Sequence, residues 1–239
     1  MVNQGGVMSA QEFLRQLDRV ITKYSMLQHP FYQAWSRGEL ALDILQKYAK
    51  QYFQFEQSFP QFISAVHSRC GNNFEARRLL LDNLVDEERS PDANTDPWHR
   101  ELWLQFTDGL GIPRDEVLFA NLLDSTKCLV NEFYSLTQHE PWFVGVAALY
   151  AYESQASAVA RTKREGLARF YNIDDPRAIE FFSEHEYADV DHSRREAGIL
   201  ALTCRTLAEQ ELALHGAEKG AEGLERFLDG IYAEYVTVS

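Results

Sequence analysis

The chain has 239 residues, of which 45% are hydrophobic and 13% aromatic, so it can bury one large core or two small ones. Its formal net charge of −13 excludes proteins that need a basic face, namely nucleic-acid binders and proteins that bind anionic membranes. No apolar run is long enough to span a membrane, and the first residues lack the basic and apolar regions of a signal peptide. Three widely spaced cysteines suit a reducing compartment, so we expect a cytoplasmic protein.

Apolar residues recur with the helical period along almost the whole chain, and no segment has a convincing strand pattern. Residues 1–8 are expected to form a disordered extension, and Ser9 with Glu12 makes a capping box that opens the first helix. The turn-rich segment 90–97 predicts the one clear loop, and Pro60 predicts a kink within a long third helix. The expected helices cover, in chain order, about residues 9–21, 30–38, 42–70, 73–88, 97–110, 114–136, 141–171, 174–208 and 217–235.

Short loops and the absence of a linker predict that residues 9–236 form a single all-α bundle. One of its helices carries His185, Asp189 and His192 in the run EHEYADVDHS. At about 100° per residue, positions i, i+4 and i+7 fall within roughly 60° of one another on a helix face. Two imidazoles and a carboxylate are usual ligands of a redox-active first-row metal such as iron or manganese. One helix face supplies only half a site, so we expect the other ligands on facing helices.

Carboxylates in the middle of apolar helices are the first candidates, because an unpaired buried charge is very costly. Glu153 lies in an apolar, small-residue stretch without a nearby acid, and it needs either a metal or a cationic partner. Glu87 continues the helix face of Leu80 and Leu84, although a solvated charge at a helix end is an alternative. His99 begins a helix beside aromatic residues, where a packed core histidine is the alternative. The predicted ligands of two divalent metal ions are Glu87, His99, Glu153, His185, Asp189 and His192.

These residues and their surroundings resemble the haem-oxygenase-like dimetal oxidases, and most closely the CADD-like branch of that family. The resemblance extends from about Phe13 to Phe227, and the six positions coincide with the family's dimetal ligand pattern. The loop between Glu87 and His99 is longer than in the family. The most similar stretches are HPFYQAWSRGEL at 29–40, AVHSRCGNNFEARRLLLDNLVDEE at 65–88, GVAALYAYESQ at 145–155 and EHEYADVDH at 184–192.

The resemblance implies a haem-oxygenase-like bundle of about seven core helices, commonly a homodimer and without haem. It implies a non-haem pair of metal ions, iron with iron or iron with manganese, that uses O₂ and electrons from an unidentified donor. The CADD-like branch is associated with making para-aminobenzoate for folate, and there the protein is its own substrate. A tyrosine side chain is excised and a lysine is the proposed amino donor. The tyrosine of the family's F-Y-x-x-W motif corresponds to Tyr32, and the lysine ten residues after a ligand glutamate corresponds to Lys163.

The chemistry of the residues leaves alternatives open. Tyr32 could be an ordinary core tyrosine, and Tyr48, Tyr52 or Tyr152 could be oxidised instead, since they lie at helical spacing near the inferred site. Without the resemblance, Lys163 in the run RTKRE is expected to be a solvated lysine. The metal pair could also oxidise an external fatty acid or amine. A non-enzymatic interaction protein is a further alternative, since the branch takes its name from an association with death domains.

Overall fold

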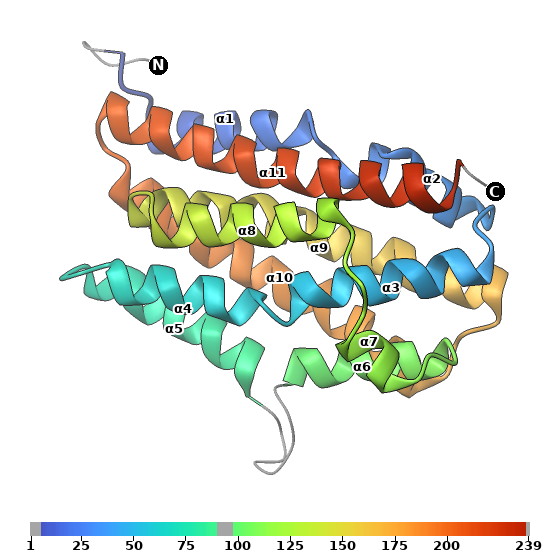
Figure 1. The fold of residues 1–239 in the computed structure, drawn as a ribbon. Helices are drawn as coiled ribbons and strands as arrows, with labels where there is room; N and C mark the ends of the chain where they lie inside the picture. The colour runs from blue at the N-terminus through green and yellow to red at the C-terminus, as the bar shows by residue number, and fades with distance from the viewer. Residues whose placement is uncertain (1–5, 90–97, 238–239) are drawn as a thin grey trace.

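The computed structural model describes residues 6–89 and 98–237, and every regular element in these ranges is helical (Figure 1). This confirms the predicted all-α class. The predicted loop at 90–97 lies outside the described residues. The helices are α1 (Ala10–Thr22), the 3₁₀ helix η1 (Met26–Gln28), α2 (Pro30–Arg37), α3 (Leu42–Glu56), α4 (Phe59–Arg69), α5 (Phe74–Glu88), α6 (Trp98–Gly109), α7 (Arg114–Leu118), α8 (Asp124–Gln138), α9 (Trp142–Tyr171), α10 (Pro176–Thr203) and α11 (Leu207–Tyr235).

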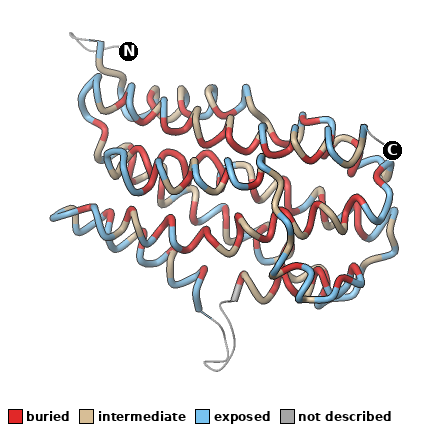
Figure 2. The backbone as a smooth tube through the Cα atoms, in the orientation of Figure 1, coloured by how far each residue is buried: buried red, intermediate tan, exposed pale blue. Residues whose placement is uncertain are grey.

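Helix α9 is the central element of the bundle. It packs most extensively against α10 and α11, and it also contacts α2, α4 and α8. In Figure 1, α1 and α11 lie on one side of α9, and α3 to α7 lie on the other. Buried residues concentrate on the faces that these helices turn toward one another (Figure 2), and they form one hydrophobic core. Side chains projecting inward from several helices therefore meet around α9.

Two glycines let α11 approach α9 closely. A Cβ atom at Gly220 would lie 3.1 Å from the Cα atom of Ala148, and one at Gly216 would lie 2.7 Å from the carbonyl oxygen of Val144. Both neighbours are backbone atoms, which cannot move aside as the end of a side chain can. The small residues thus fix the spacing of the two helices, and α9 is held firmly in the centre.

The predicted helix at 42–70 is in fact two helices, α3 and α4. Pro60 lies in the first turn of α4, where its missing N–H group needs no partner. The proline therefore begins a new helix after the chain leaves α3, and the predicted kink within one continuous helix is wrong.

The predicted helix at 114–136 is also divided, into α7 and α8. The side chain of Gln51 on α3 donates a hydrogen bond to the carbonyl of Asn121 and accepts one from the amide of Leu123. These bonds hold the connecting segment in a non-helical conformation. The division therefore depends on a tertiary contact, which the helical period of the sequence does not contain.

Helix α11 begins at Leu207, ten residues before the predicted start near Ala217. A capping box of Thr206 and Glu209 opens it, since the Thr206 hydroxyl accepts from the Glu209 amide and the Glu209 carboxylate accepts from the Thr206 amide. The same sequence signal predicted the first helix correctly, so this helix start could have been found from the sequence. Helix α10 correspondingly ends at Thr203.

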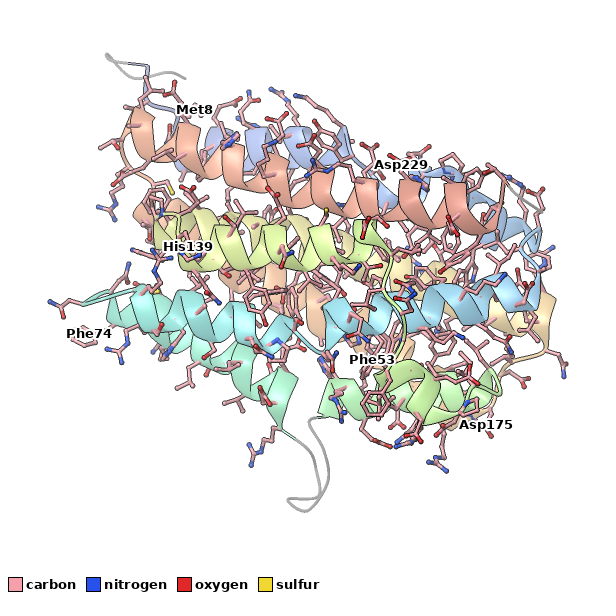
Figure 3. All side chains as sticks on the ribbon, in the orientation of Figure 1. Met8, Phe53, Phe74, His139, Asp175 and Asp229 are labelled. Atoms are coloured by element: carbon pink, nitrogen blue, oxygen red, sulfur yellow. The ribbon has the colours of Figure 1, made fainter. Side chains whose placement is uncertain are left out.

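The N-terminal segment is attached to the bundle at Met8 (Figure 3). The Met8 amide donates to Oε1 of Gln210 at 3.0 Å, and its carbonyl accepts from Nε2 of the same residue at 2.9 Å. The predicted disorder of residues 1–8 falls mainly on residues 1–5, which lie outside the described ranges, and it stays a prediction. Within the described ranges, no helix has the length and apolar character needed to cross a membrane.

Candidate metal centre

All six predicted ligands are buried, none with more than 5% of its surface exposed. They project from four helices into the space beside α9. Helix α5 provides Glu87, α6 provides His99, α9 provides Glu153, and α10 provides His185, Asp189 and His192.

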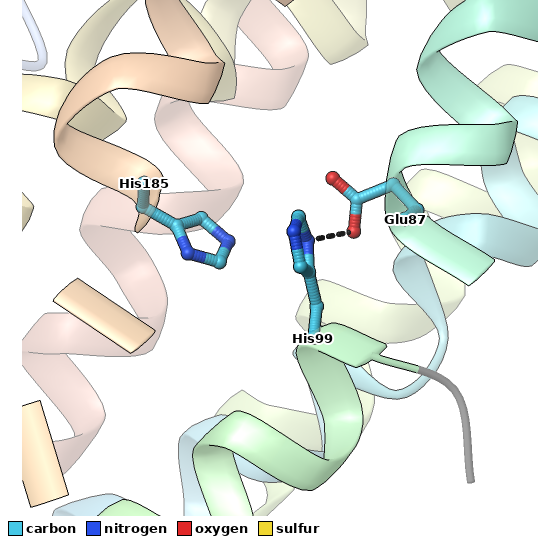
Figure 4. Close-up of side chains that lie close together, drawn as sticks. All are labelled: Glu87, His99 and His185. Atoms are coloured by element: carbon cyan, nitrogen blue, oxygen red, sulfur yellow. Dashed lines mark hydrogen bonds and ion pairs between the residues drawn. The ribbon is translucent and has the colours of Figure 1, made fainter. Parts of the chain in front are cut away.

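One group of potential ligands consists of Glu87, His99 and His185, whose ligand atoms all lie within 4.8 Å of one another (Figure 4). Nδ1 of His99 lies 2.6 Å from Oε2 of Glu87. Nδ1 of His185 lies 2.7 Å from the carbonyl oxygen of Phe181, so it must carry the proton that it donates. This hydrogen bond leaves Nε2 of the neutral His185 ring with a lone pair for a metal ion.

A second group consists of Glu87, Glu153 and His192, again with ligand atoms within 4.8 Å of one another. Nδ1 of His192 lies 3.5 Å from Oε1 of Glu153 and 3.7 Å from Oε1 of Glu87. The other nitrogen, Nε2, lies 3.2 Å from Oδ2 of Asp86, a half-exposed carboxylate that also pairs with Arg195. Asp86 thus orients the imidazole with Nδ1 toward the group, as residues around metal ligands commonly do. Glu87 belongs to both groups, so its carboxylate could contribute to holding either ion.

Asp189 belongs to neither group, yet its carboxyl lies in the same buried cluster. Burial and the neighbouring Glu153 carboxylate raise the pKa of Asp189 well above its ordinary value. For Glu87, burial acts in the same direction, but the imidazoles of His99 and His192 lower the pKa to about 2. Burial and the nearby His99 lower the pKa of His185 to about 3. Acids and imidazoles therefore strongly perturb one another here, as in many functional sites.

Buried polar atoms without partners are a second reason, independent of the sequence pattern, why the six residues suit a pair of metal ions. Both carboxylate oxygens of Glu153, Oδ2 of Asp189 and Nδ1 of His192 are buried without a hydrogen-bond partner among the described residues. Within the same ranges, no lysine or arginine forms an ion pair with Glu153 or Asp189. The imidazole of His192 lies 3.5 Å from Glu153, but one imidazolium cannot balance several buried carboxylates, and divalent metal ions would remove the penalty of burying them.

Lys163 lies inside the protein, so the expectation of a solvated lysine is wrong. Its side chain is on α9, with only 2% of the residue exposed. Its Nζ atom lies over three tyrosine rings, 5.3 Å from the ring centre of Tyr32, 5.2 Å from that of Tyr48 and 4.4 Å from that of Tyr52. Burial lowers the pKa of Lys163 to about 7, although the carboxylate of Glu56 acts in the opposite direction.

The tyrosines near Lys163 form two hydrogen-bonded groups. The hydroxyls of Tyr32 and Tyr48 lie 2.8 Å apart. Tyr52 donates to the hydroxyl of Tyr152 at 2.9 Å, and Tyr152 donates to Oε1 of Glu56 at 2.7 Å. The rings of Tyr48 and Tyr52 are stacked with centres 5.4 Å apart, which connects the two groups. All four predicted candidate tyrosines therefore belong to one buried aromatic cluster.

Glu56 was not predicted as part of the site. Only 4% of it is exposed, and burial raises its pKa to about 7 despite the hydrogen bond from Tyr152. Its position four residues after Tyr52 on α3 places the two side chains on one helix face, which is the sequence signal that could have identified it. Glu196 of α10 was also not predicted; it is fully buried, and it lies four residues after His192.

A narrow cavity joins the aromatic cluster to the metal ligands. Its lining includes Tyr52, Tyr152, Lys163, His185 and Asp189, and its volume is about 10 Å³. That is room for roughly one water molecule. A groove of about 860 Å³ lies elsewhere, between α4 and α5, and contains none of the predicted ligands. The interior therefore brings a lysine, tyrosines and metal ligands together without space for a large external molecule.

Comparisons with known proteins show the family to which the chain belongs. A family described as "iron-containing redox enzyme" matches residues 46–224. The 4-aminobenzoate synthase of Chlamydia muridarum is 40% identical over 220 residues, which cover 92% of this chain and 90% of that protein.

Solved structures agree with the fold. A CADD-like protein from Nostoc punctiforme has a TM-score of 0.78 at 17% identity, covering 95% of this chain and 99% of that one. A domain with a haem-oxygenase-like fold from Shewanella denitrificans has a TM-score of 0.74 at 16% identity, covering 94% of this chain and 90% of that one. At these identities the likeness shows the fold alone, and it confirms the predicted haem-oxygenase-like bundle.

Proposed function

We propose, from the premise that the chain belongs to the family of iron-containing redox enzymes, that it makes 4-aminobenzoate from its own Tyr32, with Lys163 as amino donor. The observation that carries this proposal is the position of the Lys163 amine, buried over the Tyr32 ring beside the predicted metal ligands. The similarity to 4-aminobenzoate synthases supports the product. The homodimer, the unidentified electron donor and the cytoplasmic location stay predictions.

The atoms of the product match those of the two side chains. In 4-aminobenzoate, a benzene ring carries a carboxyl carbon and, opposite to it, an amino group. A tyrosine side chain provides the ring and one further carbon, Cβ, opposite to the phenol oxygen. The proposed conversion breaks the Cα–Cβ bond of Tyr32, oxidises Cβ to the carboxyl carbon, and replaces the ring C–O bond by a C–N bond. The nitrogen comes from Lys163 when its Nζ–Cε bond breaks, which leaves Cε as an aldehyde, while Cα of residue 32 keeps a hydrogen in place of the side chain. Two O₂ molecules are the oxidant, and with two electrons and two protons from an external reductant the remaining oxygen, including that of the phenol, leaves as two water molecules.

The environment of Lys163 suits an amine that must react. A pKa lowered by burial to about 7 leaves much of the amine uncharged at neutral pH, and only the uncharged form is a nucleophile. Tyr32, by contrast, stays a neutral phenol, because burial raises its pKa. Trp35 donates from Nε1 to the Lys163 carbonyl at 3.2 Å, which fixes α2, the helix of Tyr32, against α9. The two reactive side chains thus approach each other from two firmly joined helices.

The six buried ligands would hold an iron pair or an iron and a manganese ion, whose contribution when bound is the activation of O₂. The protein excludes bulk water from the reacting groups, since Tyr32 is 1% and Lys163 is 2% exposed. The small cavity beside them argues for a substrate that is already part of the chain. For the same reason, oxidation of an external fatty acid or amine is the second candidate function.

Isotope labelling tests the proposal. The protein would be produced with ring-deuterated tyrosine and with lysine labelled at Nζ with heavy nitrogen. It would be loaded anaerobically with Fe²⁺ and Mn²⁺, and then exposed to reductant and O₂ without any added substrate. We expect 4-aminobenzoate that carries both labels, together with a peptide map in which Tyr32 has lost its side chain.

Two variants make the test specific. Tyr32→Phe retains the ring but not the phenol oxygen, and it should bind metal as the wild type does while releasing no 4-aminobenzoate. Tyr134→Phe is the matched control, because Tyr134 lies near the surface and its hydroxyl donates to Gln61, away from the predicted ligands. A wild-type chain that binds metal and consumes O₂ but keeps an unchanged mass would favour an external substrate. A chain that binds no metal would favour the interaction protein.

A further inference from the structure

Glu196 lies on the same face of α10 as the three predicted ligands of that helix. It follows His192 by four residues, about one helical turn, so it projects within the arc that His185, Asp189 and His192 span. It is fully buried, with 0% of its surface exposed. The face of α10 that turns toward the site therefore continues one turn beyond the six predicted ligands, to a fourth carboxylate.

Among the described residues, neither a lysine nor an arginine provides a positive charge beside Glu196. Neither of its carboxylate oxygens has a hydrogen-bond partner among the described residues, and no described lysine or arginine pairs with it. Arg195, its neighbour in sequence, instead donates to Asn83 and Asp86. The groups that act most on Glu196, apart from burial, are the carboxylates of Glu153, Asp189 and Glu87. A buried carboxylate beside other carboxylates is unfavourable without a cation.

We propose that Glu196 is a seventh ligand of the metal pair, on the side formed by Glu87, Glu153 and His192. The inference rests on the part of the proposed function that assigns two divalent metal ions to the site. Three of the six predicted ligands are carboxylates, which carry three negative charges, and the other three are neutral imidazoles. Two divalent ions carry four positive charges, so the six ligands leave one positive charge unbalanced. Glu196 supplies the missing negative charge, and its position one turn beyond His192 on the same face of α10 places it on the side of the ions. Carboxylates are ligands that both iron and manganese accept.

A metal titration tests this assignment without any turnover. The metal-free protein would be titrated anaerobically with Mn²⁺ alone, with binding followed by calorimetry and by the electron paramagnetic resonance of free Mn²⁺. Glu196→Gln keeps the shape of the side chain but removes its charge, and we expect one of the two ions to bind about 10- to 100-fold more weakly. Glu196→Asp, which restores the carboxylate, should recover part of the loss. Glu184→Gln, an exposed acid on the same helix, is the matched control and should bind as the wild type does.

Two results would overturn the assignment. Unchanged affinity for both ions in Glu196→Gln would mean that Glu196 is a neutral buried acid without a part in metal binding. A metal-free Glu196→Gln protein that unfolds more easily than the wild type would assign Glu196 a structural role, since removing an unpaired buried charge should leave the fold equally or more stable.

The titration also separates this assignment from the proposed reaction. If the wild type binds two ions but releases no 4-aminobenzoate, the proposed reaction is refuted while Glu196 can still be a ligand. If Glu196→Gln binds metal and makes product as the wild type does, Glu196 is not a ligand while the proposed reaction stands. A wild type that binds no Mn²⁺ and no Fe²⁺ would overturn both.

Discussion

Replacing Lys163 by methionine should stabilise the metal-free protein below neutral pH and lose that effect at alkaline pH. Lys163 is 2% exposed, and no described carboxylate lies within ion-pair distance of its amine. Burial lowers its pKa from 10.5 to about 7. Methionine is unbranched and similar in length but uncharged, so the variant removes a buried charge while it fills the space between the rings.

The size of the effect follows from the pKa. Since one pKa unit corresponds to about 1.4 kcal/mol, a change from 10.5 to about 7 means that burying the charged lysine opposes folding by about 5 kcal/mol. Lys163→Met should therefore raise the free energy of unfolding by about 5 kcal/mol below pH 7. Above pH 10.5 the lysine is neutral in both the folded and the unfolded chain, so the penalty grows as pH falls from 10.5 and is complete below about 7.

Urea denaturation of the metal-free protein, followed by circular dichroism from about pH 6 to about pH 10, measures the difference. Both proteins would carry Glu56→Gln, because the pKa of Glu56 is also about 7 and its titration would overlap. Lys127→Met, at an exposed lysine on α8, is the control and should show no such pH dependence. A gain for Lys163→Met that is equal at both ends of the pH range, or a loss of stability at low pH, would refute the reasoning.

Three further predictions concern the metal ligands and the packing around them. Asp86→Asn should weaken Mn²⁺ binding about 10- to 100-fold in a titration, because Asp86 orients His192; unchanged affinity would deny that role. Affinity for Mn²⁺ should rise with pH from about pH 6 up to about pH 10, because the neighbouring carboxylates, against the effect of burial, raise the pKa of His192 to about 10 and its proton must leave first; a flat profile in the same titration would contradict this. Gly166→Ala should lower the melting temperature, at a cost of about 1–3 kcal/mol, because a Cβ there would lie 2.6 Å from Trp35, whereas Gly198→Ala meets nothing within 4 Å.

The sequence was sufficient for the helical class and for selecting six residues that the structure buries together. Helices could be predicted because each one buries an apolar stripe that recurs with its own period. The predicted ligands could be selected because a residue such as Glu153 is chemically out of place on an apolar helix unless something neutralises it. The structure buries all six candidates together, although their role as ligands stays a prediction. The same argument applies to Glu196, and its position four residues after His192 is the sequence signal that could have identified it.

Other features depended on which helices become neighbours. Lys163 looked solvated because it lies in a charged run, yet it is buried because α9 passes through the centre of the bundle. The Asp86 contact with His192 joins residues 106 positions apart in the chain. The non-helical segment between α7 and α8 depends on hydrogen bonds with Gln51 on another helix. A periodic pattern contains no information about such contacts, because it reports only the faces of single helices.

The burial of Tyr32 would limit the lifetime of the protein after the proposed reaction. Its ring packs against the rings of Phe31, Trp35 and Tyr48, and 1% of the residue is exposed. Excision of the side chain would leave a void in the core like that of an aromatic-to-alanine substitution, which typically costs about 3–5 kcal/mol. Domains are stable by only about 5–15 kcal/mol, so a reacted molecule would unfold far more often and become a preferred target of proteases. The loss of stability would in this way mark each reacted molecule for degradation, and the cell would need no separate protein to recognise it.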